Sequence, residues 1–428
     1  MLKLIDKIRV FKNLKSYIYI FFSKIFSQIL FIPLMFYFWG VEATGIWIFL
    51  TSTINSINVF NINVSEYSFQ KVILSSKSKL NAIYSNSLII TIFNTFFLSI
   101  LVFLIFYFFL KNLEILENYN RQSLTIIFIC LTFVFILINL IKFLYIHFYI
   151  EGKLYFNNYN QEVVDLIYKV ILPFSGFFFS DLKILGYLYL ILIFLNFIIL
   201  LIIVHKKKNI LFFNPRLVNF SKIKNNFIGS LNYNYINLTN ILNTSVLNIL
   251  IGLFYNAEIL ALTNALINLF KNTLTKIISI GNQILMFEVP FQIKKKKSEL
   301  AKNLRDIHNK SSILICIIYL FSSILIGETI FNFWTLNKFD NYNFLMWMII
   351  FESITFVLMN NFLNFFKSIN KLEGLSIKIL IVTLVCYFSI YILNYKYSLI
   401  EIIFLIISIK NIYIFFIMKL NYFRKLRF

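Results

Sequence analysis

Lysine and asparagine side chains interrupt an apolar stretch that begins at Glu258 and ends in four consecutive lysines, Lys294 to Lys297. Its polar residues lie four, three, four and seven positions apart, so they share one helical face: Asn264, Asn268, Lys271, Thr275 and Asn282. Lys276 follows within the same apolar stretch. A charge in the hydrocarbon core costs about 2.5–3.5 kcal/mol, so we expect Lys271 and Lys276 to face a protein interior or a wet cavity.

Other apolar stretches carry similar polar residues. Lys24 interrupts the first stretch, while Asn237 and Asn240 belong to a regular polar face in a later one. No acidic residue lies one helical turn away from Lys24, Lys271 or Lys276. Several uncompensated cations facing one cavity would attract an anionic substrate such as a phosphate-bearing headgroup. Alternatively, the asparagines would form hydrogen bonds between helices that contribute about 0.6–2 kcal/mol each, and this structural role stays open.

Acidic residues in or near the apolar stretches are candidates to bind a coupling proton or sodium ion. They are Glu66, Glu162, Asp165, Glu258 and Glu352. Asp165 and Lys169 are four residues apart, a spacing that lets them neutralise one another on one helix. This second interpretation, a structural pair, stays open beside the coupling role.

The composition predicts a polytopic membrane protein. The chain of 428 residues is 60% hydrophobic with a mean hydropathy of +0.80, and only 14% of its residues are charged. Soluble domains have about 25% charged residues. The net charge of +22 is spread over short loops, which favours cytoplasmic loops facing anionic lipid over a nucleic-acid surface.

Twelve apolar segments are long enough, at about 20 residues, to span a bilayer as helices. They are Tyr17–Trp39, Gly45–Ser65, Ile83–Leu110, Leu124–Ile150, Val163–Phe179, Ile184–Val204, Phe227–Leu253, Glu258–Phe287, Ser312–Trp334, Phe344–Phe366, Leu375–Leu393 and Ser398–Met418. With both termini inside, the inner segments hold 29 of the 40 Lys and Arg residues and the outer loops hold 5. This asymmetry supports both the count and the orientation.

The domain organisation follows from two long inner loops, His205–Asn226 and Glu288–Ser311. We expect residues 1–204 to form an N-terminal six-helix bundle, 205–226 a cytoplasmic linker, and 227–428 a C-terminal six-helix bundle. Two such bundles would face each other across a cavity. The predicted fold class is therefore all-α.

Four short motifs stand out along the chain. They are the run Gly45-Ile46-Trp47-Ile48-Phe49, the polar run from Asn58 to Ser65, the segment from Gly327 to Trp334, and the turn from Asn370 to Gly374. Through these motifs and its hydropathy layout, nearly the whole chain resembles the O-antigen and polysaccharide flippases of the multidrug/oligosaccharidyl-lipid/polysaccharide exporter superfamily.

This resemblance implies a MATE-like fold in a bacterial inner membrane. It implies that the protein moves an undecaprenyl-diphosphate-linked repeat unit between leaflets by alternating access, without being an enzyme. The expected cationic cavity is lined partly by the first, second, seventh and eighth helices, where Lys24, Lys271 and Lys276 lie. No resident cofactor is expected, only H⁺ or Na⁺ coupling. Expected partners are membrane lipids, a polysaccharide polymerase and a chain-length regulator, with no nucleic acid.

Two rival functions are weighed against the flippase. A membrane polymerase or ligase would be expected to have a large outer loop with catalytic Arg or His, but Lys111–Ser123 has only Arg121. An ion-coupled small-solute transporter of the facilitator type would carry a glycine-acid-arginine motif after its second span, which is absent. No GxxxxGK, GxGxxG or HExxH motif occurs, and Cys130, Cys316 and Cys386 are expected to be buried hydrophobes rather than metal ligands.

Overall fold

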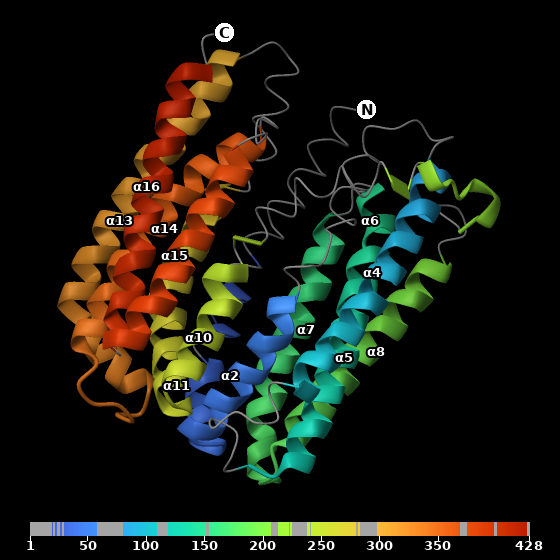
Figure 1. Ribbon diagram of the computed structural model, residues 1–428, viewed down its shortest axis with the longest axis horizontal. Helices are drawn as coiled ribbons and strands as arrows, with labels where there is room; N and C mark the ends of the chain where they lie inside the picture. Colours follow the sequence, from blue (N-terminus) through green and yellow to red (C-terminus); the bar gives the residue numbers. More distant parts are fainter. Residues whose placement is uncertain are drawn as a thin grey trace. The chain divides into compact units, whose positions relative to one another are not determined.

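A computed structural model describes most of the apolar segments of the chain. The described residues are 19, 22–23, 26–27, 30–57, 80–108, 119–150, 154–206, 213–221, 223–224, 238–239, 241–279, 281–282, 298–368, 375–397 and 400–425. They form two compact units, Met1–Glu258 and Ile259–Phe428, whose helices are drawn in Figure 1. Each unit is described by itself below.

The fold is all-α and polytopic, as the sequence predicts. Six helical segments among the described residues are long and apolar enough to cross a membrane: Leu80–Phe106, Arg121–Phe148, Lys183–Lys206, Asn303–Trp334, Asn343–Phe366 and Ile400–Leu420. Leu242–Phe254 and Ile377–Leu393 are shorter apolar helices. Each of the twelve predicted spans contains described helical residues.

The N-terminal unit is built around the packing of two long helices. Its described elements are residues 30–38, α2 (Val41–Ser56), α4 (Leu80–Phe108), α5 (Arg121–Leu144), α6 (Ile146–Ile150), α7 (Leu154–Phe174), η5 (Ser175–Phe177), α8 (Lys183–Lys206), η6 (Pro215–Leu217), η7 (Leu242–Val246) and α10 (Leu247–Phe254). Helices α5 and α8 pack side by side, joined by α4, α7 and α2. Their shared core includes Val134, Tyr145 and Leu200.

Glycine permits a close approach on helix α2. A Cβ atom on Gly45 would overlap the carbonyl oxygen of Ala257, which belongs to the same unit. Any larger residue would therefore push α2 away from this backbone. The approach places the neighbouring Trp47, which is buried, in the interior of the unit.

The C-terminal unit is organised around helix α14. Its elements are the end of α11 (Ala257–Leu266), η8 (Ile267–Asn272), the helical residues that follow to 282, α13 (Ser298–Trp334), α14 (Asn343–Ser368), α15 (Leu375–Tyr397) and α16 (Ile400–Lys425). Helix α14 packs on α16, η8 and α13, and α16 also packs on α15. The unit also contains a buried apolar cluster, formed by Leu274, Ile278, Cys316 and Val357.

One boundary differs from that expected. Helix α13 begins at Ser298, so the second half of the predicted inner loop Glu288–Ser311 is helical, because polar residues can extend a helix beyond the apolar span. In sequence, the first compact unit ends at Glu258. Helix α10 belongs to the first unit, where the Asn248 amide donates a 3.0 Å hydrogen bond to the Ser52 hydroxyl of α2. The division into two six-helix bundles stays a prediction.

Candidate functional site

A π-turn interrupts the eighth apolar helix at its polar residues. Residues Ile267–Asn272 (η8) use the wider i→i+5 pattern between α11 and the α-helical turns that follow. One extra residue in a turn rotates the following side chains by about 100° relative to a straight α-helix. The π-turn contains Lys271, and η8 packs against α14. Lys271 is therefore directed into the C-terminal unit rather than kept in line with Asn264 and Asn268.

Lys271 forms a buried ion pair with a carboxylate on another helix. Its Nζ lies 2.9 Å from Oε1 of Glu352 on α14, and the two side chains are 5% and 0% exposed. The ammonium also lies 4.8 Å from the ring centroid of Phe356, one turn further along α14. Lys271 does face a protein interior, as predicted. The expectation that it is uncompensated is wrong, because its counter-charge comes from a distant part of the sequence.

Helix α16 completes this arrangement with an amide and a second lysine. Asn411 Nδ2 donates to Glu352 Oε1 at 3.3 Å and to the Thr355 hydroxyl at 3.4 Å. Lys410, the preceding residue, is 3% exposed, and its Nζ lies 6.0 Å from the Tyr387 ring centroid on α15. Its charge interacts with those of both Glu352 and Lys271. We call Lys271, Glu352, Lys410 and Asn411 the C-terminal cluster.

The C-terminal cluster combines two cations with one carboxylate. All four side chains are buried, so their charges interact in a medium of low dielectric. The second carboxylate oxygen, Glu352 Oε2, is buried and has no hydrogen-bond partner among the described residues. The cluster therefore has a net positive charge together with one oxygen that can accept a proton or a cation.

The predicted asparagines lie on the same helical segment as Lys271. Asn268 donates to Asn264 at 2.7 Å, and Asn272 donates to Asn268 at 2.8 Å, so the amides form a ladder along the helix. These residues and Lys276 are partly exposed. Asn264 and Asn268 are thus hydrogen-bonded to each other along the helix, whereas Lys271 pairs with Glu352 on another helix.

The N-terminal unit contains the predicted pair on α7. Lys169 Nζ lies 2.6 Å from Asp165 Oδ2, one turn away, and donates to the Ser27 hydroxyl at 3.2 Å. The two side chains are 18% and 37% exposed. We call Asp165 and Lys169 the N-terminal pair; their mutual neutralisation is confirmed. Glu162, on the same helix, is 4% exposed.

Four predicted site residues, Lys24, Asn237, Asn240 and Glu66, lie outside the described residues. Within the described ranges, no group of three or more His, Cys, Asp or Glu side chains is placed to hold a metal ion. Cys130, Cys316 and Cys386 are buried free thiols.

Comparison with solved structures identifies the fold. The "lipid II flippase MurJ" in an inward closed conformation superposes with a TM-score of 0.65 at 15% identity, covering 97% of this chain and 87% of that one. An inward-facing multidrug resistance MATE family transporter of the MOP superfamily gives 0.64 at 10% identity, covering 98% and 96%. The MATE multidrug transporter DinF-BH gives 0.64 at 13% identity, covering 96% and 94%.

This is the fold of MOP-superfamily transporters. No protein-family profile and no curated protein sequence matches the chain. The similarity is thus one of architecture. It confirms the predicted MATE-like arrangement of helices and leaves the function to be argued from the residues inside the fold.

Sequence reasoning missed half of the C-terminal cluster. Lys410 and Asn411 are adjacent polar residues in the middle of the last apolar span, and an intramembrane cation is by itself a signal of a specialised site. Glu352 was a candidate coupling acid. What no spacing rule could supply is that Glu352, 81 residues beyond Lys271, meets it across two helices.

Proposed function

We propose that this protein is a flippase that moves undecaprenyl-diphosphate-linked oligosaccharide units across a bacterial inner membrane by alternating access. The units would feed the synthesis of a surface polysaccharide such as O-antigen or capsule. A polysaccharide polymerase and a chain-length regulator would then act on the translocated units.

One observation carries this proposal: among the described residues, the interior of the C-terminal unit places two buried lysines near one carboxylate. Lys271 pairs with Glu352, and the charge of Lys410 interacts with the charges of both. Lys276, which is partly exposed, adds a further cation five residues along from Lys271. Placing several lysines among apolar helices is costly. A cationic interior is favoured in a protein whose cargo carries the compensating negative charge.

The fold by itself does not select the cargo. Structures described as multidrug transporters and one described as a lipid II flippase superpose on this chain about equally well. Architecture is shared across functions, and specificity resides in the side chains placed on it. The positive interior supports the lipid-linked anion over a cationic drug.

The diphosphate would first meet the partly exposed Lys276 and the asparagine ladder of Asn264 and Asn268. Amide donors and an ammonium are suited to phosphate oxygens, because charge-assisted hydrogen bonds are about twice as strong as neutral ones. The same negative charge would compete with Glu352 for Lys271. Uptake of H⁺ or Na⁺ by Glu352, whose Oε2 has no hydrogen-bond partner within the described ranges, would then offset the released charge. Glu162 and Asp165 are the corresponding candidate acids in the N-terminal unit.

The direct test is translocation by the purified protein. Proteoliposomes would be loaded with a fluorescent undecaprenyl-diphosphate-linked oligosaccharide, and the fraction in the outer leaflet measured over time by a membrane-impermeant quencher. We expect faster exchange than in protein-free liposomes, and slower exchange for Lys276→Gln than for the wild type. Lys206→Gln, which changes an exposed lysine at the end of α8, is the matched control. Exchange no faster than in empty liposomes would overturn the proposal.

A deletion in the host separates the rival functions. Complete single repeat units accumulating on the cytoplasmic side support the flippase. Units that have crossed the membrane but are not joined would instead identify a polymerase or ligase. A host without any glycan defect would point to an ion-coupled transporter of some other solute.

A further inference from the structure

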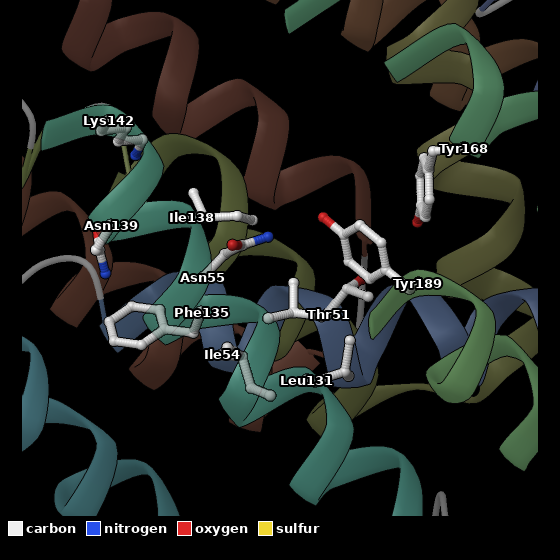
Figure 2. Close-up of a pocket in the computed structure, with 11 residues that line it drawn as sticks. Thr51, Ile54, Asn55, Leu131, Phe135, Ile138, Asn139, Lys142, Tyr168 and Tyr189 are labelled. Atoms are coloured by element: carbon white, nitrogen blue, oxygen red, sulfur yellow. The ribbon is translucent and has the colours of Figure 1, made fainter. Parts of the chain in front are cut away.

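A cavity lies inside the N-terminal unit, remote in sequence from the C-terminal cluster. It has a volume of about 280 Å³ and is lined by side chains from α2, α5, α7 and α8 (Figure 2). Sites for small molecules have volumes of about 300–1,000 Å³, so this cavity is near the lower end of that range. It would hold a single sugar with a phosphate group.

The cavity has a cationic end formed by helix α5. The exposed Lys142 and the buried Asn139 lie there, beyond Ile138 in Figure 2. An ammonium has three donors, so Lys142 can keep a protein contact and still donate to a ligand. The eleven described residues that line the cavity include one lysine and no carboxylate. A cationic ligand would be repelled at this end, and an anion would be attracted.

The opposite end is aromatic. The rings of Tyr168 and Tyr189 have centroids 4.3 Å apart, and the indole Nε1 of Trp47 donates to the Tyr168 hydroxyl at 3.3 Å. These contacts fix the orientation of both phenols. Tyr189 points its hydroxyl towards the middle of the cavity, near Asn55 (Figure 2). Aromatic rings with fixed hydroxyl groups offer both an apolar surface and hydrogen bonds to a ligand that has both kinds of group.

Polar groups of α2 line the middle of the cavity. Asn55 contributes an amide between Lys142 and Tyr189 (Figure 2). The Thr51 hydroxyl donates to the backbone of its own helix, at 2.8 Å to the Trp47 carbonyl, so its oxygen still accepts hydrogen bonds. Leu131 and Lys142 both line the cavity eleven residues apart on α5, so the lining extends about 16 Å along that helix.

We propose that this cavity binds a glycosyl phosphate, with the phosphate at Lys142 and the sugar ring between Asn55 and the Tyr168–Tyr189 pair. The order of groups along the cavity matches the order in the ligand: a cation for the phosphate, an amide for ring hydroxyls, and aromatic rings for the apolar sugar face. This inference rests on the proposed function where the glycosyl phosphate is the head of a lipid-linked unit. A free sugar phosphate has the same chemistry.

Equilibrium binding to the full chain in detergent tests the cavity without requiring transport. The radiolabelled 1-phosphates of glucose, galactose and N-acetylglucosamine would be the probes, and the corresponding free sugars the comparison. We expect Lys142→Gln to weaken sugar phosphate binding at least about tenfold, since a charge-assisted hydrogen bond is lost, and to leave the free sugars unaffected. Tyr189→Leu should weaken both kinds of probe.

The control variant is Lys206→Gln, which removes an exposed lysine at the end of α8, and its binding should equal that of the wild type. Gel filtration and thermal unfolding would establish that Lys142→Gln is folded. Failure of every sugar phosphate to bind in a Lys142-dependent manner would overturn the inference.

Translocation assays on the same variants separate the two proposals. If the wild type moves lipid-linked units and Lys142→Gln changes neither sugar phosphate binding nor translocation, the cavity assignment is wrong and the flippase stands. If sugar phosphates bind through Lys142 but lipid-linked units are not moved, the flippase is wrong. The cavity would then be a site for a free sugar phosphate.

Discussion

The C-terminal cluster and the N-terminal pair place charge inside the helices in two different ways. Asp165 and Lys169 are neighbours on one helix, partly exposed, and held by a side-chain contact that four-residue spacing supplies. Lys271 and Glu352 come from different helices, are almost fully buried, and share their surroundings with Lys410. The first arrangement satisfies its charges locally, whereas the second depends on the packing of α14 and α16 around η8.

This difference predicts unequal consequences when one charge is removed. A buried pair that loses one partner leaves an uncompensated ion, at a cost of about 3–5 kcal/mol, while an exposed pair contributes about 0–1 kcal/mol. The C-terminal cluster has the additional cation of Lys410. We therefore expect it to be the more sensitive of the two regions, for stability and for transport.

The largest effect is expected for Glu352→Gln. The substitution removes the carboxylate that pairs with the buried Lys271. We therefore expect the free energy of unfolding to decrease by about 3–5 kcal/mol, with the largest decrease in unfolding temperature of the variants considered. Thermal unfolding of the purified protein in detergent, followed by tryptophan fluorescence, measures it. Glu328→Gln, at an exposed position of α13, is the matched control. Equal stability of the two variants would contradict the comparison.

A double substitution distinguishes structure from transport. Lys271→Met with Glu352→Met removes both charges of the pair, and apolar replacement of a buried pair is often neutral or stabilising. We expect the double variant to be more stable than Glu352→Gln by at least about 1 kcal/mol, because no buried lysine at position 271 is left without its counter-charge. Translocation should nevertheless be lost in the double variant. A stable double variant that transports normally would show that the pair serves only the fold.

An intermediate effect is expected for Asn411→Leu. The amide donates a long hydrogen bond of 3.3 Å to the charged Glu352. We therefore expect its loss to lower the free energy of unfolding by about 1.5 kcal/mol. The ion pair itself remains in this variant. Thermal unfolding should place it between Glu352→Gln and the wild type. A decrease in unfolding temperature as large as that of Glu352→Gln would mean that the Asn411 amide, rather than the ion pair, organises the cluster.

The same contrast explains how far the sequence could predict the molecule. Hydropathy and the distribution of lysines predict twelve helical segments, each of which contains described helical residues, because each signal is local to one span. The N-terminal pair is predictable for the same reason, since Asp165 and Lys169 are one turn apart. Lys271 is predictable as buried, because the membrane penalises an exposed charge in mid-span.

The partner of Lys271 is not predictable in this way. Asn264, Asn268 and Lys271 have the spacing of a single helical face, but η8 inserts a π-turn that directs Lys271 towards α14. No residue type in the segment Ile267–Asn272 requires that turn. The contact of Lys271 with Glu352 depends on the packing of η8 against α14, which is a property of the packed unit. The cavity at Lys142 likewise depends on four helices coming together.

The smallest effect is expected for Asp165→Asn, and its response to salt sharpens the comparison. We expect the free energy of unfolding to decrease by only about 0.3–1 kcal/mol, because the Lys169 ammonium remains partly solvated and keeps its contact with Ser27. Raising the ionic strength from about 0.1 to 1 M shortens the screening length from about 10 to 3 Å. The stability difference between Asp165→Asn and the wild type should then shrink, while that of Glu352→Gln stays unchanged, because salt does not reach a buried pair. Equal salt dependence of the two differences would mean that solvent reaches Glu352, and the buried character of the C-terminal cluster would have to be abandoned.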